Sequence, residues 1–374
     1  MQNTNAHRAL NCGQSIWLDN ISRAMFTDGT LKRMIEQGLR GMTSNPTIFE
    51  KSIGGGTEYD NQINAALQTG ESDFQIYDEL TVTDIQKAAD MFLPVYRESD
   101  SRDGYVSLET NPELAYDSKE TVKEVQRLKA RVDRPNVMFK VPATAEGFPA
   151  IERLTAEGVN INITLIFSLE QYEKTAGAFI RGLQSLYKRG GEPGRIASVA
   201  SVFVSRIDTL ADTRIEAQMD AEADPQRKQR LRALKGRIAL ANSGLIYARF
   251  REIFSGQDFL ELSKNGAGLQ RVLWGSTSTK NPQYDDLKYV DNLIGKNTVN
   301  TMPTQTFHLF LDHGKPIETL TGEKSEAKKV LKELADCGIS YDNICNTLLR
   351  EGVDKFSNSF KSLLNTIHQK RASL

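Results

Sequence analysis

The chain has 374 residues, of which 39% are hydrophobic and 25% are charged, so it is long enough to bury a large core. Its 47 basic and 48 acidic residues give a formal net charge of −1, which argues against nucleic-acid binding but not against a small anionic ligand. The three cysteines and four histidines lack metal-type spacing, so no metal site is predicted. The absence of a signal-peptide pattern and of a run of 18 apolar residues predicts a cytoplasmic protein with no membrane partner.

Short apolar stretches alternate with amphipathic ones along the chain. In chain order, strands are expected at residues 15–19, 41–45, 105–109, 136–141, 159–167, 196–204, 271–276 and 298–302. Helices are expected at 21–38, at 60–98, at 118–132 with a cap at Asp117 or Ser118, at 145–157 with an end at Gly158, at 168–187, at 206–254 with a break near Asp224 and Pro225, and at 315–369.

Strands that alternate with helices predict a parallel α/β sheet, and eight repeats predict a closed (β/α)8 TIM barrel. We expect one domain over residues 1–374, with helical insertions near 60–98 and 210–265 and extra C-terminal helices. The main rival is an open, doubly wound sheet. That fold usually has a glycine-rich phosphate loop after its first strand, and the glycine run at 54–56 lacks the required spacing.

Lys140 lies in the otherwise apolar strand segment VMFKVP. Burial favours the uncharged form of a lysine side chain, and an uncharged amine can attack a carbonyl carbon to form a Schiff base. The alternative is a barrel lysine that is held in an ion pair. The pattern of the strand leaves both interpretations open.

Two carboxylates, Asp19 and Glu109, end the first and third expected strands. Active sites of barrels lie at the carboxyl ends of the strands, and Schiff-base chemistry requires groups that accept and return protons. Either carboxylate could instead be the ion-pair partner of Lys140.

Polar side chains also mark the ends of other strands. Asn45 precedes a proline, so it could hold a hydroxyl group of a ligand or cap the following turn. Strand alternation points Asn162 and Thr164 to the same face, which suggests ligand contact or a buried hydrogen bond.

Two candidate phosphate sites follow the late strands. The first combines Ser201 and Ser205 with Arg206 at the start of a helix. The second is the stretch GSTSTK, residues 275–280, which offers free N–H groups and the cation Lys280. Phosphate sites in barrels commonly lie after the late strands.

Four motifs together resemble the transaldolase family over residues 15–305. They are TSNP at 43–46, SLE at 107–109 with PELA at 112–115, FKVPAT at 139–144, and NITLIFS at 162–168. The chain length and the helical insertions look like those of the longer bacterial members.

The resemblance implies a role for each site residue. Lys140 matches the Schiff-base lysine, and Asp19 matches the acid/base carboxylate. Glu109 matches the carboxylate that acts through a water beside a threonine, here Thr164. The remaining matches are to ligand contacts: Asn45 and Asn162 for the three-carbon unit, and Ser201 and Arg206 for phosphate. Many relatives have Gly-Ala-Ser-Phe-Arg after the seventh strand, so Lys280 is the expected substitute for that arginine.

The activity implied by the resemblance is transfer of a dihydroxyacetone unit from sedoheptulose 7-phosphate to glyceraldehyde 3-phosphate, giving erythrose 4-phosphate and fructose 6-phosphate. The partners are then sugar phosphates. No cofactor is expected, because the lysine itself serves as the electron sink. Two alternatives stay open: a lyase such as a fructose-6-phosphate aldolase, and a sugar-phosphate binding protein without activity.

Overall fold

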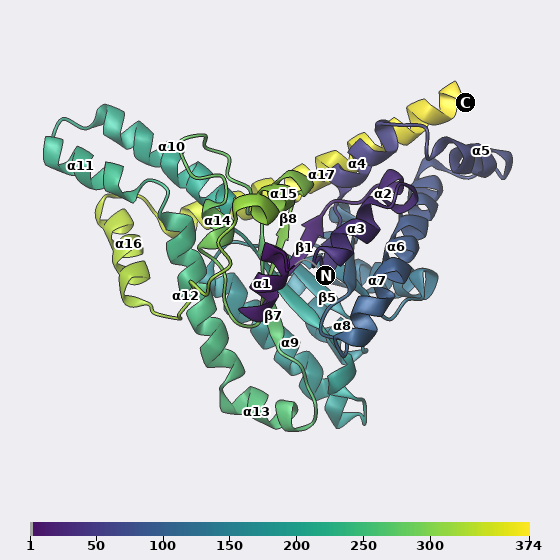
Figure 1. Cartoon of the computed structure of the whole chain (residues 1–374), viewed down its shortest axis with the longest axis horizontal. Helices are drawn as coiled ribbons and strands as arrows, with labels where there is room; N and C mark the ends of the chain where they lie inside the picture. The colour runs from purple at the N-terminus through teal and green to yellow at the C-terminus, as the bar shows by residue number, and fades with distance from the viewer. Residues whose placement is uncertain (1–2) are drawn as a thin grey trace.

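The computed structural model describes residues 3–374 and contains a closed barrel of eight parallel strands (Figure 1). Each strand pairs with its neighbours in chain order, and β1 closes the barrel by pairing with β8. The predicted (β/α)8 fold is therefore confirmed, and the open sheet is excluded. The strands are β1 (Gln14–Asp19), β2 (Gly41–Thr43), β3 (Tyr105–Glu109), β4 (Val137–Pro142), β5 (Ile161–Ile166), β6 (Ser198–Phe203), β7 (Gln270–Gly275) and β8 (Thr298–Met302).

Helices follow most strands and cover the outside of the barrel. The helices before β4 are α1 (Asn5–Asn11), α2 (Arg23–Thr27), α3 (Thr30–Glu36), α4 (Pro46–Gly54), α5 (Asp60–Gln68), α6 (Asp73–Glu98), the short η1 (Pro112–Leu114) and α7 (Ser118–Val132). Between β4 and β8 lie α8 (Gly147–Ala156), α9 (Leu169–Lys188), η2 (Pro193–Arg195), α10 (Ser205–Ala221), α11 (Pro225–Leu234), α12 (Ile238–Phe254), α13 (Gln257–Lys264) and α14 (Lys288–Asp291). The chain ends with α15 (Thr304–His313), α16 (Ser325–Asp336) and α17 (Tyr341–Ser373).

Several predicted boundaries were correct. The helix at 118–132 forms as expected, and Asp117 caps it by accepting hydrogen bonds from the backbone N–H groups of Lys119 and Glu120. Gly158 follows α8 with φ +74°, a conformation that favours glycine. The regions expected as insertions, 60–98 and 210–265, contain α5 and α6 and most of α10 to α13, respectively.

Other boundaries were wrong, and turn residues explain most of them. The helix expected at 21–38 is divided at Gly29, which has φ +75° and lies at the N-cap of α3. The helix expected at 60–98 is divided at Gly70, and a capping box at Ser72 starts α6. The break expected near Asp224 and Pro225 is present at residues 222–224, but the region 206–254 is also broken at 235–237, which was not expected. The region 315–324 is not helical, and Pro316 and Gly322 lie within it.

Strand ends also differ from the prediction. β2 ends at Thr43 because Asn45 is already the N-cap of α4. β5 starts at Ile161 and carries an irregularity before Ile166, where Leu165 adopts φ +60°. A left-handed conformation is uncommon for a leucine and bends the end of this strand.

The part of the barrel interior away from the polar strand ends is filled by a separate apolar cluster: Trp17, Tyr105, Met138, Val199, Leu273 and Val299. Trp17 is fully buried, and a side chain at Gly41 would lie 2.6 Å from its ring. Gly41 therefore leaves the space that the indole occupies. The cluster closes the barrel below the polar strand ends, so the open end lies at their carboxyl termini.

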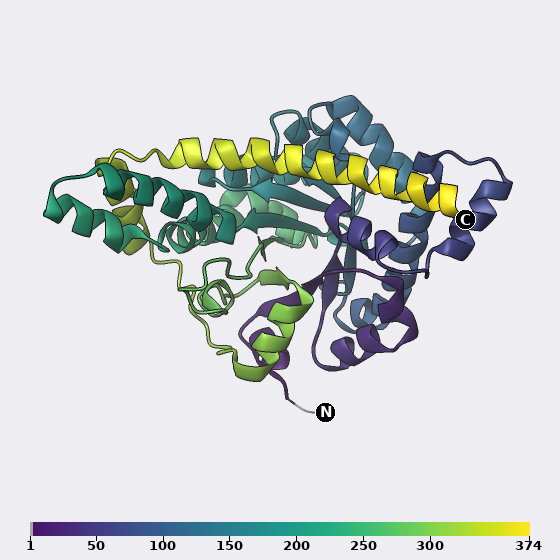
Figure 2. The same cartoon turned by 90° about the horizontal axis from the view of Figure 1, so that it is seen from above.

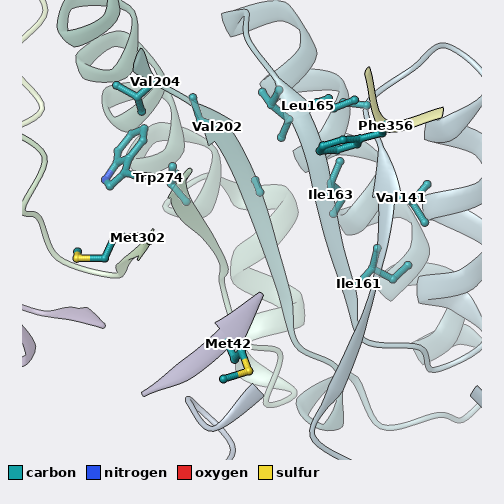
Figure 3. Close-up of a cluster of buried hydrophobic side chains, with 14 of the residues drawn as sticks. Met42, Val141, Ile161, Ile163, Leu165, Val202, Val204, Trp274, Met302 and Phe356 are labelled. Carbon is teal, nitrogen blue, oxygen red and sulfur yellow. The ribbon is translucent and has the colours of Figure 1, made fainter. Parts of the chain in front are cut away.

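The outer face of the strands is also apolar and packs against the surrounding helices. Figure 3 shows part of this layer, with Val141, Ile161 and Ile163 on β4 and β5 and with Phe356 of α17 beside Leu165. The strands are thus apolar on their outer face and carry polar residues inward at their ends.

Helix α17, yellow in Figure 2, runs across most of the molecule and is the longest helix described. It packs against α4, α6, α10 and β5, so it passes the carboxyl ends of the strands. A Cβ atom at Gly352 would lie 2.9 Å from a methyl group of Leu165, so this glycine lets the helix approach the bent end of β5. Among residues 3–374, no helix combines the length and apolar character that a membrane span requires.

Candidate active site

A cavity of about 1080 Å³ opens at the carboxyl ends of the strands. Two candidate site residues, Glu109 and Ser205, are not part of its lining. The others are: Asp19, Asn45, Lys140, Asn162, Thr164, Ser201, Arg206 and Lys280. The strands bring together residues that are up to 261 positions apart, from Asp19 to Lys280. Polar groups that the sequence placed on separate strands therefore share one site.

Lys140 and Glu109 form a buried ion pair at the centre of the site. They are register partners on β4 and β3, and their side chains are only 6% and 7% exposed. Lys140 Nζ lies 2.8 Å from Glu109 Oε2 and donates a second hydrogen bond, of 3.1 Å, to the carbonyl oxygen of Ser44. Burial raises the pKa of Glu109, and the Lys140 charge opposes that rise. The ion pair that was the alternative interpretation of Lys140 is thus present in the structure.

Asp19 lies across the cavity at the end of β1. Its Oδ1 accepts a 2.7 Å hydrogen bond from Thr43 Oγ1, and Thr43 Oγ1 lies 2.8 Å from Thr301 Oγ1. Burial raises the pKa of Asp19, although Lys140, Thr43 and Arg206 lower it in part. A carboxylate with a raised pKa accepts a proton more readily, which suits a general base or acid.

The amide of Asn162 is fixed from both sides. Its nitrogen donates to Ser107 Oγ at 3.1 Å, and its oxygen accepts from Ser201 Oγ at 2.5 Å. Asn45 lines the cavity and also caps α4, because its Oδ1 accepts a hydrogen bond from the backbone N–H of Ile48. Both roles considered for Asn45 are therefore compatible with its position.

Thr164 is fully buried and lines the cavity together with Asn162. Its hydroxyl oxygen has no hydrogen-bond partner among residues 3–374. Buried hydroxyl groups are nearly always paired in folded proteins, so a partner from a ligand or a water is expected at this position.

The two candidate phosphate sites meet at one side of the cavity. Ser205 N donates a 3.0 Å hydrogen bond to the carbonyl oxygen of Ser276, and the two serine hydroxyls also lie 3.0 Å apart. Arg206 lies with its guanidinium 5.2 Å from the ring centre of Phe203, and burial lowers its pKa. Lys280 lines the same cavity and donates to Ser278 Oγ at 2.7 Å.

Sequence reasoning missed the contributions of β8 and α17. Thr301 of β8 completes the hydrogen-bond chain to Asp19, and Phe356 of α17 places its ring 5.7 Å from Lys140 Nζ. Lys355 and Glu351 of α17 also line the cavity. No local pattern links α17 to the barrel mouth, whereas the alternation of β8 could have indicated Thr301.

Comparison with known proteins identifies the family of the chain. Residues 16–367 match the sequence model of the family described as Transaldolase/Fructose-6-phosphate aldolase. The chain belongs to that family. It is 44% identical to the protein named transaldolase from Trichodesmium erythraeum over 364 residues, which is 96% of each chain. It is 42% identical to "Transaldolase 2" of Nostoc punctiforme over 96% of this chain and 95% of that protein, and 42% identical to the transaldolase of Saccharopolyspora erythraea over 98% of both.

Membership of the transaldolase/fructose-6-phosphate aldolase family makes the chain an enzyme that forms a Schiff base. Of the lysines that line the cavity, Lys140 alone lies inside the barrel strands and is buried. The names of the family cover both a transferase and a lyase, and the two differ in what happens after the carbon–carbon bond breaks.

Proposed function

We propose that the chain catalyses the transaldolase reaction and transfers a dihydroxyacetone unit from sedoheptulose 7-phosphate to glyceraldehyde 3-phosphate. The observation that carries the proposal is the position of Lys140 between a buried carboxylate on one neighbouring strand and a fixed amide on the other. The full-length similarity to proteins named transaldolase supports it. The reaction would belong to the non-oxidative pentose phosphate pathway in the cytoplasm.

The first step makes Lys140 an uncharged nucleophile. Glu109 accepts the proton of the Lys140 ammonium, because burial has already raised the pKa of this carboxyl. The free amine then attacks the ketone carbon, and the carbinolamine loses its hydroxyl group as water while Glu109 returns the proton. A water held between Glu109 and the Thr164 hydroxyl would carry protons that Glu109 cannot reach directly.

The second step breaks the carbon–carbon bond. Asp19 removes the proton from the hydroxyl group beyond that bond, and the bonding electron pair moves into the protonated imine of Lys140. An aldose phosphate leaves as an aldehyde, and the three-carbon unit stays on Lys140 as an enamine. A second aldose phosphate then enters, and the same steps run in reverse with Asp19 as the acid.

Binding depends on two groups of residues at opposite ends of the substrate. Asn45 and Asn162 would hold the hydroxyl groups of the three-carbon unit, because both line the cavity close to the strand ends. Arg206 and Lys280 would contact the phosphate. Ser201 would contact it only if its hydroxyl turned away from Asn162 Oδ1, to which it donates its one proton. Charged hydrogen bonds to phosphate are about twice as strong as neutral ones, so this end would supply most of the affinity.

A trapping experiment tests the covalent step. The enzyme is incubated with fructose 6-phosphate, reduced with borohydride, digested and mapped by mass spectrometry. The adduct is expected on Lys140, and a folded Lys140→Ala variant should neither carry the label nor turn over substrate. An adduct on another lysine, or turnover by Lys140→Ala, would contradict the assignment.

A second assay separates the transferase from the lyase. The transferase should release little free dihydroxyacetone from fructose 6-phosphate alone, and it should form sedoheptulose 7-phosphate when erythrose 4-phosphate is added. Rapid release of dihydroxyacetone without an acceptor would instead support a fructose-6-phosphate aldolase.

A further inference from the structure

Four cationic side chains line one part of the cavity wall: Lys51, Arg206, Lys280 and Lys355. None of them forms an ion pair within 4.0 Å with a carboxylate in residues 3–374. Other cationic side chains of the chain do form ion pairs. Arg127, for example, pairs with Asp78 at 2.6 Å and with Glu124 at 2.9 Å. The cavity therefore gathers positive charge that the folded chain leaves without close partners.

Lys355 comes from the C-terminal helix and is held at the cavity by its neighbours in that helix. Phe356, the next residue, is buried with its ring near Lys140. Gly352, one turn earlier, lies against the bent end of β5 at Leu165. These two contacts fix the rotation of α17, so the side chain of Lys355 lines the cavity beside Arg206.

The charges in this part of the cavity act on one another. The pKa of Lys355 is lowered mainly by the charge of Arg206, with smaller contributions from burial, Lys280 and Lys51. Glu351, one turn away on α17, is an acidic group that partly offsets the charge of Arg206. A dianionic ligand would relieve this mutual repulsion, whereas a neutral one would not.

We propose that Lys355 is an additional cationic contact to the phosphate group of the sugar phosphate, so that α17 is a working part of the active site. This rests on the proposed function, because it assigns a ligand contact within the same cavity. Lys280, which the family resemblance implies as the substitute for an arginine, is exposed, as is Lys355, and offers a single point charge. A cation from α17 would compensate for the missing two-pronged contact.

The test compares two lysines of the same helix. Lys355→Met removes the proposed contact, and Lys361→Met is the matched control, because Lys361 lies on α17 with its side chain 63% exposed and 3.5 Å from Glu113. Calorimetric titration with inorganic phosphate is the first readout. Loss of one charged contact should weaken phosphate binding about tenfold in Lys355→Met, with no change in Lys361→Met.

Kinetics give the second readout. The ratio of kcat/KM for glyceraldehyde 3-phosphate to kcat/KM for unphosphorylated glyceraldehyde should fall about tenfold in Lys355→Met. Lys355→Arg should restore most of the ratio. Phosphate binding and a kcat/KM ratio in Lys355→Met equal to those of the wild type would overturn the proposal, as would a wild-type enzyme that binds no phosphate.

The two proposals can fail separately. If borohydride labels Lys140 but Lys355→Met binds phosphate normally, the role of Lys355 is wrong and the proposed function stands. If phosphate binding depends on Lys355 but no adduct forms on Lys140, the contact stands and the proposed function is wrong.

Discussion

Lys140 Nζ and Glu109 Oε2 lie 2.8 Å apart in the interior of the barrel, on strands whose register makes the two residues direct neighbours. Such a buried pair is costly to desolvate, and removal of one member leaves the other without compensation. If this pair only stabilised the fold, two apolar side chains of similar volume would stabilise it equally well. The pair is useful chemically, because a proton can pass between the two groups without crossing solvent.

Replacement of Glu109 by Gln should slow imine formation. Gln can accept the hydrogen bond of Lys140 but can neither take its proton nor return one to the carbinolamine hydroxyl, so the proton transfers of imine formation become slower. We expect the rate of adduct formation with fructose 6-phosphate to fall about a hundredfold, as for loss of a general base. A time course of borohydride quenching measures this rate. The surface variant Glu113→Gln should match the wild type, and an unchanged rate in Glu109→Gln would exclude the proposed proton transfer.

Replacement of Asp19 by Asn should separate the two chemical steps. Asp19 acts on the hydroxyl group beyond the scissile bond, so its loss should lower kcat about 10² to 10⁴-fold. The borohydride-trapped adduct on Lys140 should still form, because imine formation does not require Asp19. Loss of both turnover and adduct would place Asp19 in the imine step instead.

The same variant should change how stability depends on pH. The folded protein holds a proton on Asp19 more tightly than the unfolded chain does, because burial raises the pKa of this carboxyl above its ordinary value of 3.8. Its contribution to the free energy of unfolding is therefore complete below about pH 3.8 and is lost as the pH rises through the raised pKa. Urea unfolding between pH 4 and 8 should show a wild-type stability that falls relative to Asp19→Asn. A difference that does not change with pH would contradict the raised pKa.

The chemistry of the site could be predicted because its signals are local. Lys140, Glu109 and Asp19 are charged residues at the ends of apolar strands, and such placement needs a reason that a short stretch of sequence reveals. The barrel then determines the rest, since consecutive parallel strands place Glu109 beside Lys140 and Lys140 beside Asn162.

Other features depend on contacts that no local pattern encodes. Phe356 and Lys355 reach the site because α17 packs across the barrel mouth, more than 200 residues after the lysine in the chain. The left-handed conformation of Leu165 bends β5. Leucine rarely adopts this conformation, so the bend could not be predicted from the residue type. Helix breaks such as Gly29 were visible, but a single glycine inside a helical pattern does not decide between a break and a tolerated residue.

Gly41 should be required for the packing of the barrel interior. A methyl group at this position would lie 2.6 Å from the ring of Trp17, which is fully buried and cannot move aside. Gly41→Ala should therefore lower the free energy of unfolding by about 1–3 kcal/mol, as for other overpacked cores. Gly268→Ala is the control, because a Cβ there would meet no atom within 4 Å. Equal urea midpoints for the two variants would show that the barrel accommodates the methyl group.

Asp103 should stabilise the end of the barrel opposite the active site. Its Oδ1 lies 3.0 Å from Arg271 Nη2, its Oδ2 accepts a 2.8 Å hydrogen bond from Ser15, and both charged side chains are almost fully buried. Asp103→Ala leaves the buried charge of Arg271 without a carboxylate partner, so the free energy of unfolding should fall by about 3–5 kcal/mol. Because the pair lies near the amino ends of the strands, kcat and KM of the folded variant should stay within about twofold of the wild type.

Two further variants test whether the destabilisation comes from the buried pair and not from loss of any charge. Glu192→Ala breaks an exposed pair with Arg195, and this should cost about 1 kcal/mol or less. Arg271→Met should destabilise as Asp103→Ala does. The double variant should lose less than the sum of the two, since neither member of this pair then leaves the other unpaired, although Arg40 still loses its contact with Asp103. Additive losses would mean that Asp103 and Arg271 stabilise the barrel independently, through Ser15 and the neighbouring backbone rather than through each other.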